Sequence, residues 1–144
     1  MNILFVCTGN TCRSPMAAVL MNQLAMEKNL DVRIESAGIY AQEGAPATEG
    51  AILAMQAYGI DLSGHRAKQI TSELLTQCDL ILTMTSAHKA ALSGIENCYT
   101  LSEYAGFSGE IADPFGGSAE VYRVCAGQIF EAVKRVAERI EHSE

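Results

Sequence analysis

A cysteine and an arginine separated by five residues are the part of this sequence whose types and spacing could do chemistry. They are Cys7 and Arg13, in the stretch Val6-Cys7-Thr8-Gly9-Asn10-Thr11-Cys12-Arg13-Ser14-Pro15. A cysteine thiolate is a strong nucleophile. The arginine guanidinium is a planar fork of donors that matches phosphate oxygens. The pair therefore predicts a nucleophile placed beneath a bound phosphate group.

The residues on either side of this stretch predict a strand before it and a helix after it. The apolar run Ile3-Leu4-Phe5-Val6 predicts a short buried strand. Ser14 and Pro15 predict a helix start, with Ser14 as the capping hydroxyl and Pro15 in the first turn. The loop between them must curl tightly, which Gly9 and Asn10 allow because both tolerate a positive φ.

A loop curled in this way predicts an anion-binding nest. Its main-chain N–H groups would turn inward above the positive end of the following helix. The helix dipole, these amides and Arg13 would together stabilise the thiolate form of Cys7. The loop matches neither the Walker A pattern nor the GxGxxG fingerprint. The expected phosphate-binding residues are Thr8, Gly9, Asn10, Thr11, Cys12 and Arg13.

Other roles for the cysteines are open at this point. All five could be core residues, because free cysteine is often buried. Cys7 and Cys12 could also form a redox dithiol or half of a metal site. The other three, Cys78, Cys98 and Cys125, are scattered, and no CxxC or HxxxH spacing completes a ligand set. We therefore expect no metal and no cofactor.

Length, charge and cysteine usage narrow the class of protein. The 144 residues predict a single domain, 1–144, that can bury a core. Neither a membrane span nor a signal peptide is visible. The odd cysteine count favours a reducing cytoplasm. A net charge of −7 without a basic stripe argues against nucleic acid as a partner. We expect a cytoplasmic monomer that binds neither nucleic acid nor membrane.

Strand and helix patterns alternate along the chain, which predicts an α/β sandwich with a parallel sheet and right-handed crossovers. Ligands would then bind at the carboxyl ends of the strands, where the cysteine loop lies. Strands are expected at 3–6, 32–36, 80–84 and 97–101, and helices at 14–28, 48–58, 71–77, 86–92 and from 118 onward.

A second candidate site residue lies far along the sequence in a glycine-bearing loop. Attack by a thiolate on phosphorus expels a leaving group that needs a proton. Asp113, in Asp113-Pro114-Phe115-Gly116-Gly117, is the best candidate for this acid. Alone, an Asp-Pro pair usually just starts a turn. The histidines have blander interpretations: His65 is expected to be structural, His88 a surface residue, and His142 part of a frayed tail.

At these residues the sequence resembles the low-molecular-weight protein-tyrosine phosphatases. The likeness comprises Cys7 to Pro15 and the late Asp113-Pro114, together with Ser36-Ala37-Gly38 and the segments 59–66 and 79–84. It implies a single-domain, three-layer α/β sandwich with a four-stranded parallel sheet flanked by helices. It also implies a two-step, metal-independent mechanism on phosphorylated proteins, through a cysteinyl-phosphate intermediate.

The resemblance assigns a role to each motif residue. Cys7 would attack phosphorus, while Arg13 and the loop amides would hold the phosphoryl oxygens. Asp113 would protonate the leaving group and then activate water. Asn10 would lock the shape of the loop, and Ser14 would hydrogen-bond the Cys7 thiolate. Cys12 matches the family cysteine that can trap an oxidised nucleophile as a disulfide.

Two departures from the tyrosine phosphatases resemble the bacterial protein-arginine phosphatases. Thr11 stands where an aliphatic residue is usual, and Asp113-Pro114 is followed by Phe115 rather than by an aromatic pair. A threonine hydroxyl can accept a hydrogen bond from a guanidinium, and Asp113 could pair with one. We expect phosphoarginine as the substrate group, with phosphotyrosine as the alternative if Thr11 only packs within its loop. Tyr40 is expected to form a cleft wall.

Two other functions use related sequences. Thioredoxin-coupled arsenate reductases have a similar first loop but need two further cysteines on and after the segment that follows the third strand. That segment, 83–88, has no cysteine pair, and Cys78 and Cys98 do not match, which disfavours this reaction. A non-catalytic phosphoprotein-binding module would not need to keep Cys7, Arg13 and Asp113 together.

Overall fold

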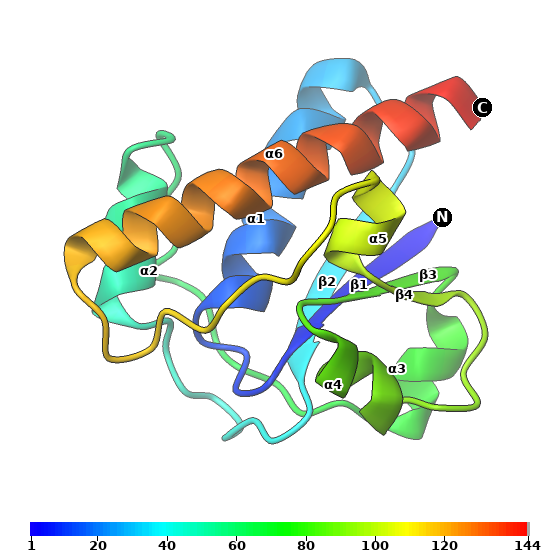
Figure 1. The fold of residues 1–144 in the computed structure, drawn as a ribbon, viewed down its shortest axis with the longest axis horizontal. Coiled ribbons are helices and arrows are strands. Elements are labelled where there is room, and N and C mark those ends of the chain that lie inside the picture. Colours follow the sequence, from blue (N-terminus) through cyan, green and yellow to red (C-terminus); the bar gives the residue numbers. More distant parts are fainter. Residues whose placement is uncertain (144) are drawn as a thin grey trace.

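The computed structural model describes residues 1–143 and contains a four-stranded sheet between two layers of helices (Figure 1). The strand order is β2-β1-β3-β4, and every neighbouring pair is parallel, as the sequence predicts. In chain order the elements are β1 (Asn2–Cys7), α1 (Arg13–Lys28), β2 (Arg33–Gly38), α2 (Glu49–Gln56), α3 (Ser72–Gln77), β3 (Leu80–Thr83), α4 (Ser86–Ala91), β4 (Cys98–Thr100), α5 (Leu101–Ala105) and α6 (Ala119–Ser143).

The strand β1 lies inside the sheet because it is apolar on both faces. Successive side chains of a strand point to opposite faces. Ile3 and Phe5 pack into one buried cluster, and Leu4 and Val6 pack into the other. A continuous apolar run of this kind is typical of a parallel strand covered on both sides. The last residue of β1 is Cys7, so the sheet delivers the predicted nucleophile to its carboxyl edge.

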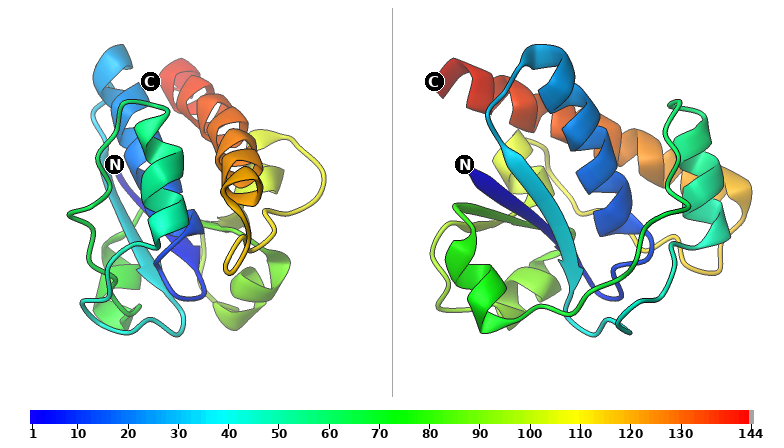
Figure 2. Two further views of the ribbon diagram at one scale, coloured as in Figure 1. Left: turned by 90° about the vertical axis from the view of Figure 1, so that its left-hand side faces the viewer. Right: turned by 180° about the vertical axis from the view of Figure 1, so that it is seen from behind.

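The two helical layers differ in size (Figure 2). The helices α1, α2, α5 and α6 cover the face that contains Ile3 and Phe5, and α6 packs along α1. The opposite face is covered by α3 and α4, with Leu74, Leu75 and Leu92 in contact with its smaller cluster. None of the helices in residues 1–143 combines the length and apolar character needed to cross a bilayer.

The fourth strand is shorter than predicted, and a helix that we did not predict follows it. The predicted strand 97–101 is β4, which ends at Thr100, and α5 begins at Leu101. Glu103 N donates to Thr100 Oγ1 at 3.1 Å, and Thr100 N donates to Glu103 Oε1 at 2.9 Å. This reciprocal pair is a capping box, whose T-x-x-E pattern is readable in the sequence. The strand prediction was therefore wrong at Leu101.

One glycine at the end of β2 is needed for the loops at the carboxyl edge to pack. A Cβ added to Gly38 would lie 2.6 Å from Thr8 O and 3.0 Å from Asn10 N. Both are main-chain atoms of the loop between β1 and α1, which cannot rotate away as a side chain can. Gly38 therefore lets this loop rest directly on β2, which extends two residues beyond the predicted 32–36.

We expect Gly38→Ala to destabilise the protein by about 1–3 kcal/mol, because the new methyl group must displace backbone. Gly64→Ala is the matched control, since a Cβ there meets nothing within 4 Å, and we expect a change within about 0.5 kcal/mol. The measurement is the free energy of unfolding in urea. Equal stabilities for the two variants would contradict the close packing inferred at Gly38.

Candidate active site

The main-chain carbonyls of the loop between β1 and α1 accept hydrogen bonds from other parts of the protein. Four of them, and the carbonyl of Cys7 at the end of β1, accept hydrogen bonds, mostly from distant segments, so the loop is held by its carbonyl side. These bonds run from Ile39 N to Cys7 O (3.0 Å), Tyr40 N to Thr8 O (2.9 Å), His65 Nε2 to Asn10 O (2.7 Å), Thr48 N to Thr11 O (3.0 Å) and Met16 N to Cys12 O (3.2 Å).

The N–H groups of the same loop have the opposite status. Within residues 1–143, no hydrogen bond to a protein acceptor is made by any main-chain N–H from Thr8 to Ser14. Successive main-chain donors without a protein acceptor, gathered on one tightly curled loop, form a concave site for an anion. The run continues into the first turn of α1, where the helix dipole adds positive potential.

Asn10 fixes the shape of this loop from inside the protein. Its φ is 58°, in the left-handed region, and its side chain is fully buried. Nδ2 donates to Ser14 Oγ at 2.8 Å and to Ser36 Oγ at 2.9 Å, while Oδ1 accepts from Lys68 N at 3.0 Å. The predicted positive φ is thus present at Asn10, but Gly9 does not share it.

Ser14 is not the helix cap that the sequence predicted. The helix α1 begins at Arg13, and Cys12 in the N-cap position makes no side-chain capping bond. The Ser14 hydroxyl instead lies 2.9 Å from Cys7 Sγ. Because Ser14 Oγ already accepts a hydrogen bond from Asn10, its own hydrogen is free to point at the sulfur. The Ser14–Cys7 contact is the one that the family resemblance implies.

Arg13 is buried between the loop and the segment that carries Asp113. Only 4% of Arg13 is exposed, and Nη1 donates to Ile111 O at 2.9 Å. Nη2 lies 3.8 Å from Asp113 Oδ2. The Asp113 side chain is half exposed, and its other oxygen accepts a hydrogen bond from Phe115 N at 3.1 Å. The two halves of the predicted site, 100 positions apart in the sequence, therefore meet at Arg13.

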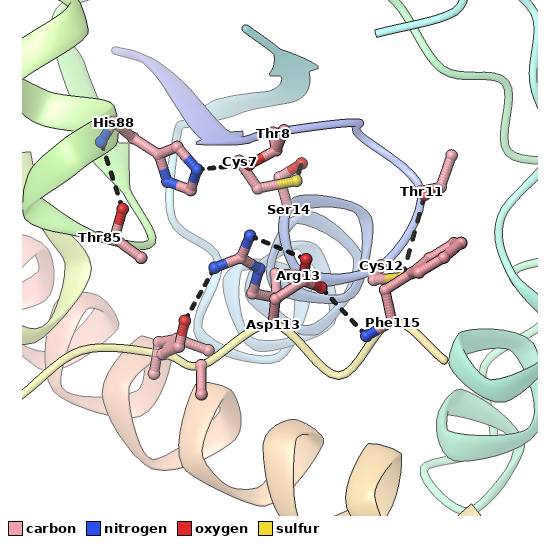
Figure 3. Close-up of polar contacts among 12 residues, drawn as sticks. Cys7, Thr8, Thr11, Cys12, Arg13, Ser14, Thr85, His88, Asp113 and Phe115 are labelled. Atoms are coloured by element: carbon pink, nitrogen blue, oxygen red, sulfur yellow. Dashed lines mark hydrogen bonds and ion pairs between the residues drawn. The ribbon is translucent and has the colours of Figure 1, made fainter. Parts of the chain in front are cut away.

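These residues surround a cavity of about 260 Å³. Figure 3 shows Cys7 and Thr8 together, with His88 on one side, Thr11 and Phe115 on the other, and Arg13 and Asp113 beside them. Tyr40, the predicted cleft wall, does not line the cavity and is 82% exposed. The lining residues are Cys7, Thr8, Gly9, Thr11, Cys12, Arg13, Asp113 and Phe115.

Cys12 is held by two hydroxyl groups from other elements. Its Sγ lies 3.3 Å from Thr48 Oγ1 and 3.3 Å from Tyr122 Oη. Burial raises the pKa of Tyr122 to about 12, so its hydroxyl keeps its proton. The Tyr122 ring passes against Gly50, where an added Cβ would lie 2.3 Å from the ring. Sequence reasoning missed Tyr122 because its role depends on a contact 110 positions away.

Two histidines contact the loop, and one of them corrects a prediction. His65 donates to Asn10 O, which fits the structural role expected of it. His88 was predicted to be a surface residue, but it is buried, with 7% exposed. Its Nε2 lies 2.8 Å from Thr8 Oγ1. His88 lies in a short helix that follows a short strand and a capping threonine, so no local pattern showed which face of that helix is buried.

The remaining cysteines have surroundings that disfavour thiolate chemistry. Burial raises the pKa of Cys78 and of Cys98, and it raises the pKa of Cys125 to about 12. All five cysteines are free thiols. Among residues 1–143, no three His, Cys, Asp or Glu side chains are grouped so that they could hold a metal ion. The chemistry that the cavity can do is nucleophilic attack by Cys7 on a bound oxyanion.

Comparisons with known proteins agree with this geometry. A family model described as low molecular weight phosphotyrosine protein phosphatase matches residues 2–144. A protein-arginine-phosphatase of Bacillus subtilis is 37% identical over 147 residues, which covers 98% of this chain and 97% of that protein. A low molecular weight protein-tyrosine-phosphatase, PtpB of Staphylococcus epidermidis, is 36% identical, covering 94% of this chain and 96% of that protein.

A solved structure gives the same picture. It is described as the YwlE arginine phosphatase, a C7S mutant with a phosphorylated active-site serine. Its fold matches with a TM-score of 0.93 at 37% sequence identity, over 96% of this chain and 95% of that one. The predicted fold is therefore confirmed by both the architecture and a known relative.

We expect Asn10→Ala to destabilise the protein by about 3 kcal/mol, because three side-chain hydrogen bonds, two of them buried, are lost and alanine must adopt a positive φ. The affinity for inorganic phosphate should fall at least about tenfold, because the loop loses its internal support. Urea unfolding and calorimetric titration measure the two effects.

The matched control is Asn29→Ala, which also changes an asparagine of positive φ, 53°, but at the exposed end of α1. It should cost about 1 kcal/mol and leave phosphate affinity unchanged. If both variants bound phosphate like the wild type, Asn10 would not be the residue that shapes the site.

Proposed function

The chain belongs to the low molecular weight phosphotyrosine protein phosphatase family, and we propose that it removes phosphate from phosphoarginine residues of proteins. The observation that carries this proposal is a single cavity containing Cys7, Arg13 and Asp113 with Thr11 on its wall. Protein-arginine phosphatases are among its relatives at 37% and 39% identity, covering 97% and 95% of those proteins.

In the proposed first step, the Cys7 thiolate attacks phosphorus and an S–P bond forms. The P–N bond to the arginine side chain breaks, and its electron pair stays on nitrogen. Arginine is a very strong base, so its nitrogen leaves well only if it receives a proton as the bond breaks. The Asp113 carboxyl supplies that proton. Arg13 and the unpaired N–H groups of residues 8–14 stabilise the charge on the phosphoryl oxygens.

In the second step, water replaces the cysteine. The Asp113 carboxylate takes a proton from a water molecule whose oxygen attacks phosphorus. The S–P bond then breaks, inorganic phosphate leaves and the Cys7 thiolate is regenerated, with Ser14 donating to it at 2.9 Å. Arg13 Nη2 lies 3.8 Å from Asp113 Oδ2, so the base and the phosphoryl-binding guanidinium adjoin each other in this step. No redox partner or metal enters the balance of either step.

The surroundings of Thr11 support arginine over tyrosine. Within residues 1–143, the hydrogen-bond contact of Thr11 Oγ1 is a weak one, with Cys12 Sγ at 3.9 Å. Its hydroxyl is thus not committed to the loop, which weighs against a purely packing role, and it can accept a hydrogen bond from a substrate guanidinium. Asp113 adds a half-exposed carboxyl group to the same cavity, where it can hydrogen-bond a substrate guanidinium.

Phosphotyrosine remains the second candidate because of Phe115. This side chain is 70% exposed and lines the cavity, so an aromatic substrate ring could stack on it. The relative PtpB is named as a protein-tyrosine-phosphatase. A guanidinium plane can stack on the same phenyl ring, however, so Phe115 does not decide between the two substrates.

Arsenate reduction is disfavoured by the positions of the other cysteines. Cys78 and Cys98 pack against the cluster on the α3 and α4 side of the sheet, whereas Cys7 and Cys12 belong to the cluster on the other side. An oxidising equivalent would have to pass through the sheet from one pair to the other. Burial also raises the pKa of Cys78 and Cys98, which disfavours the thiolates that such exchange needs.

The remaining expectations are part of the proposal. We propose that residues 1–144 form one phosphatase domain, active as a monomer on phosphorylated proteins. A reducing, cytoplasmic setting is supported by five free thiols. The proposal that Cys12 traps oxidised Cys7 as a disulfide is supported by their shared place on the cavity lining.

The substrate proposal is tested by kcat/KM on two matched peptides, one with phosphoarginine and one with phosphotyrosine. We expect the wild type to prefer phosphoarginine, and Thr11→Ile to reduce that preference by about tenfold to a hundredfold, because the hydroxyl acceptor is replaced by an aliphatic wall. Thr76→Ile, on the exposed surface of α3, is the control and should change nothing. A wild-type preference for phosphotyrosine would overturn the assignment of phosphoarginine.

The proposed role of Asp113 predicts a dependence on the leaving group. Asp113→Asn should slow the enzyme by about 10²–10⁴-fold on phosphoarginine peptides, which need a proton donor, and far less on aryl phosphates with strongly acidic phenols. The readout is kcat/KM for a series of leaving groups, because it reports the first step alone, whereas kcat would also include the loss of Asp113 as the base of the second step. Asp31→Asn, an exposed carboxylate between α1 and β2, should leave the series unchanged. Equal losses across the series would exclude Asp113 as the acid.

A further inference from the structure

A buried histidine touches the phosphate loop from the side opposite Thr11. His88 lies on α4, and its Nε2 is 2.8 Å from the hydroxyl of Thr8, the residue that follows Cys7 (Figure 3). Thr8 is exposed and lines the cavity, whereas the histidine ring behind it is buried. The mechanism proposed above assigns no task to either side chain. A role for these two side chains shares one premise with the proposed function, which is that the loop binds a phosphoryl group.

The other ring nitrogen of His88 decides where its proton lies. Within the part of the chain that the structure describes, His88 Nδ1 is the one buried side-chain nitrogen or oxygen without a hydrogen-bond partner. A buried N–H without an acceptor is among the rarest features of folded proteins. A proton on Nδ1 would create such a group, whereas a proton on Nε2 is accepted by Thr8 Oγ1. The favoured tautomer therefore carries its proton on Nε2.

The charges around His88 keep it in this neutral form. Burial lowers its pKa, and Arg13 on α1 lowers it further. The carboxylates of Asp113 and Glu110, on the loop before α6, act in the opposite direction but do not outweigh these effects. At neutral pH the ring therefore stays uncharged, with one donor and one acceptor nitrogen.

The short helix α4 is fixed at its first turn, so the ring has a defined position. His88 N donates to Thr85 Oγ1 at 3.2 Å, and Thr83 Oγ1 in turn donates to Thr85 O at 2.9 Å. Ser86 N donates to Glu110 Oε1 at 2.6 Å, which ties the same turn to the segment leading to Asp113. His88 is thus held by β3 and by the loop before α6 together.

We propose that His88 is a positioning residue that makes the Thr8 hydroxyl a hydrogen-bond donor to the bound phosphoryl group. Thr8 Oγ1 accepts a hydrogen bond from His88 Nε2–H. The hydroxyl hydrogen of Thr8 then has no acceptor within the protein and points into the cavity. Without His88, this hydroxyl rotates freely. Phosphate binding must then fix its orientation, and the entropy lost in doing so weakens binding. Ser14 follows the same logic, because it accepts from Asn10 and donates to Cys7.

The test uses inorganic phosphate, whose binding does not depend on which phosphorylated residue is the substrate. We expect His88→Leu and Thr8→Val each to raise the Kd for phosphate about tenfold in calorimetric titrations, as expected for the loss of a hydrogen bond to an anion. The double variant should bind no more weakly than either single one, because both remove the same interaction. His88→Gln, which retains an amide donor, should recover affinity to within about threefold of the wild type.

Lys89→Leu, on the next position of α4, is the matched control and should leave the Kd unchanged, since its partner Glu103 lies outside the cavity. The ¹⁵N spectrum of the wild-type imidazole is an independent readout that needs no variant. It should show a neutral ring protonated at Nε2 at pH 7. A ring protonated at Nδ1 would overturn the proposal.

The outcomes separate this inference from the proposed function. Additive losses in the double variant, or wild-type affinity in His88→Leu, would mean that His88 does not act through Thr8, while the phosphatase assignment would stand. Failure of the wild type itself to bind phosphate would overturn both.

Discussion

The structure depends on a separation of polarity along one loop, in which carbonyls face the protein and N–H groups do not. Five carbonyls between Cys7 and Cys12 accept hydrogen bonds from α1, from the residues just after β2, and from the segments before α2 and before α3. The N–H groups from Thr8 to Ser14 find no acceptor within the described residues. Main-chain donors cannot be removed by substitution except with proline, so this potential is a property of the loop shape. The residues that fix this shape, such as Asn10 and Gly38, therefore affect phosphate affinity indirectly, through the position of the N–H groups.

Two hydroxyl groups extend this polarity from the backbone to side chains. A hydroxyl has one hydrogen and can either donate or accept along a given direction. The side-chain amide of Asn10 donates to the Ser14 hydroxyl, and the His88 ring donates to the Thr8 hydroxyl. In each case the hydroxyl oxygen accepts from within the protein, and the hydroxyl hydrogen is directed away from that donor. The Ser14 hydroxyl is then oriented toward Cys7 Sγ and the Thr8 hydroxyl toward the cavity, so neither has to reorient during the reaction.

The sequence predicted those features whose cause is local. The spacing of Cys7 and Arg13 between an apolar run and Pro15 was enough to place the loop, and Asn10 was correctly expected to adopt a positive φ. The helix α5 was missed although its capping box is local, because the run 97–101 was interpreted by its apolar character alone. His88 is a different case: its environment is set by how α4 docks on the loop, a packing outcome that no short pattern encodes.

Arg13 connects the chemistry at phosphorus with the chemistry at the leaving group. One side of its guanidinium donates to Ile111 O, so the segment that carries the proposed acid is anchored by the residue proposed to bind the phosphoryl oxygens. Ile111 N is bonded to Met84 O at the end of β3, which fixes the same segment to the sheet. Asp113, two residues further on, remains half exposed and is free to follow the leaving group. The donors that surround the cavity are therefore mostly main chain, whereas the proposed choice of substrate rests on the Thr11 side chain at the cavity wall. A change of substrate within this architecture needs no change in its catalytic geometry.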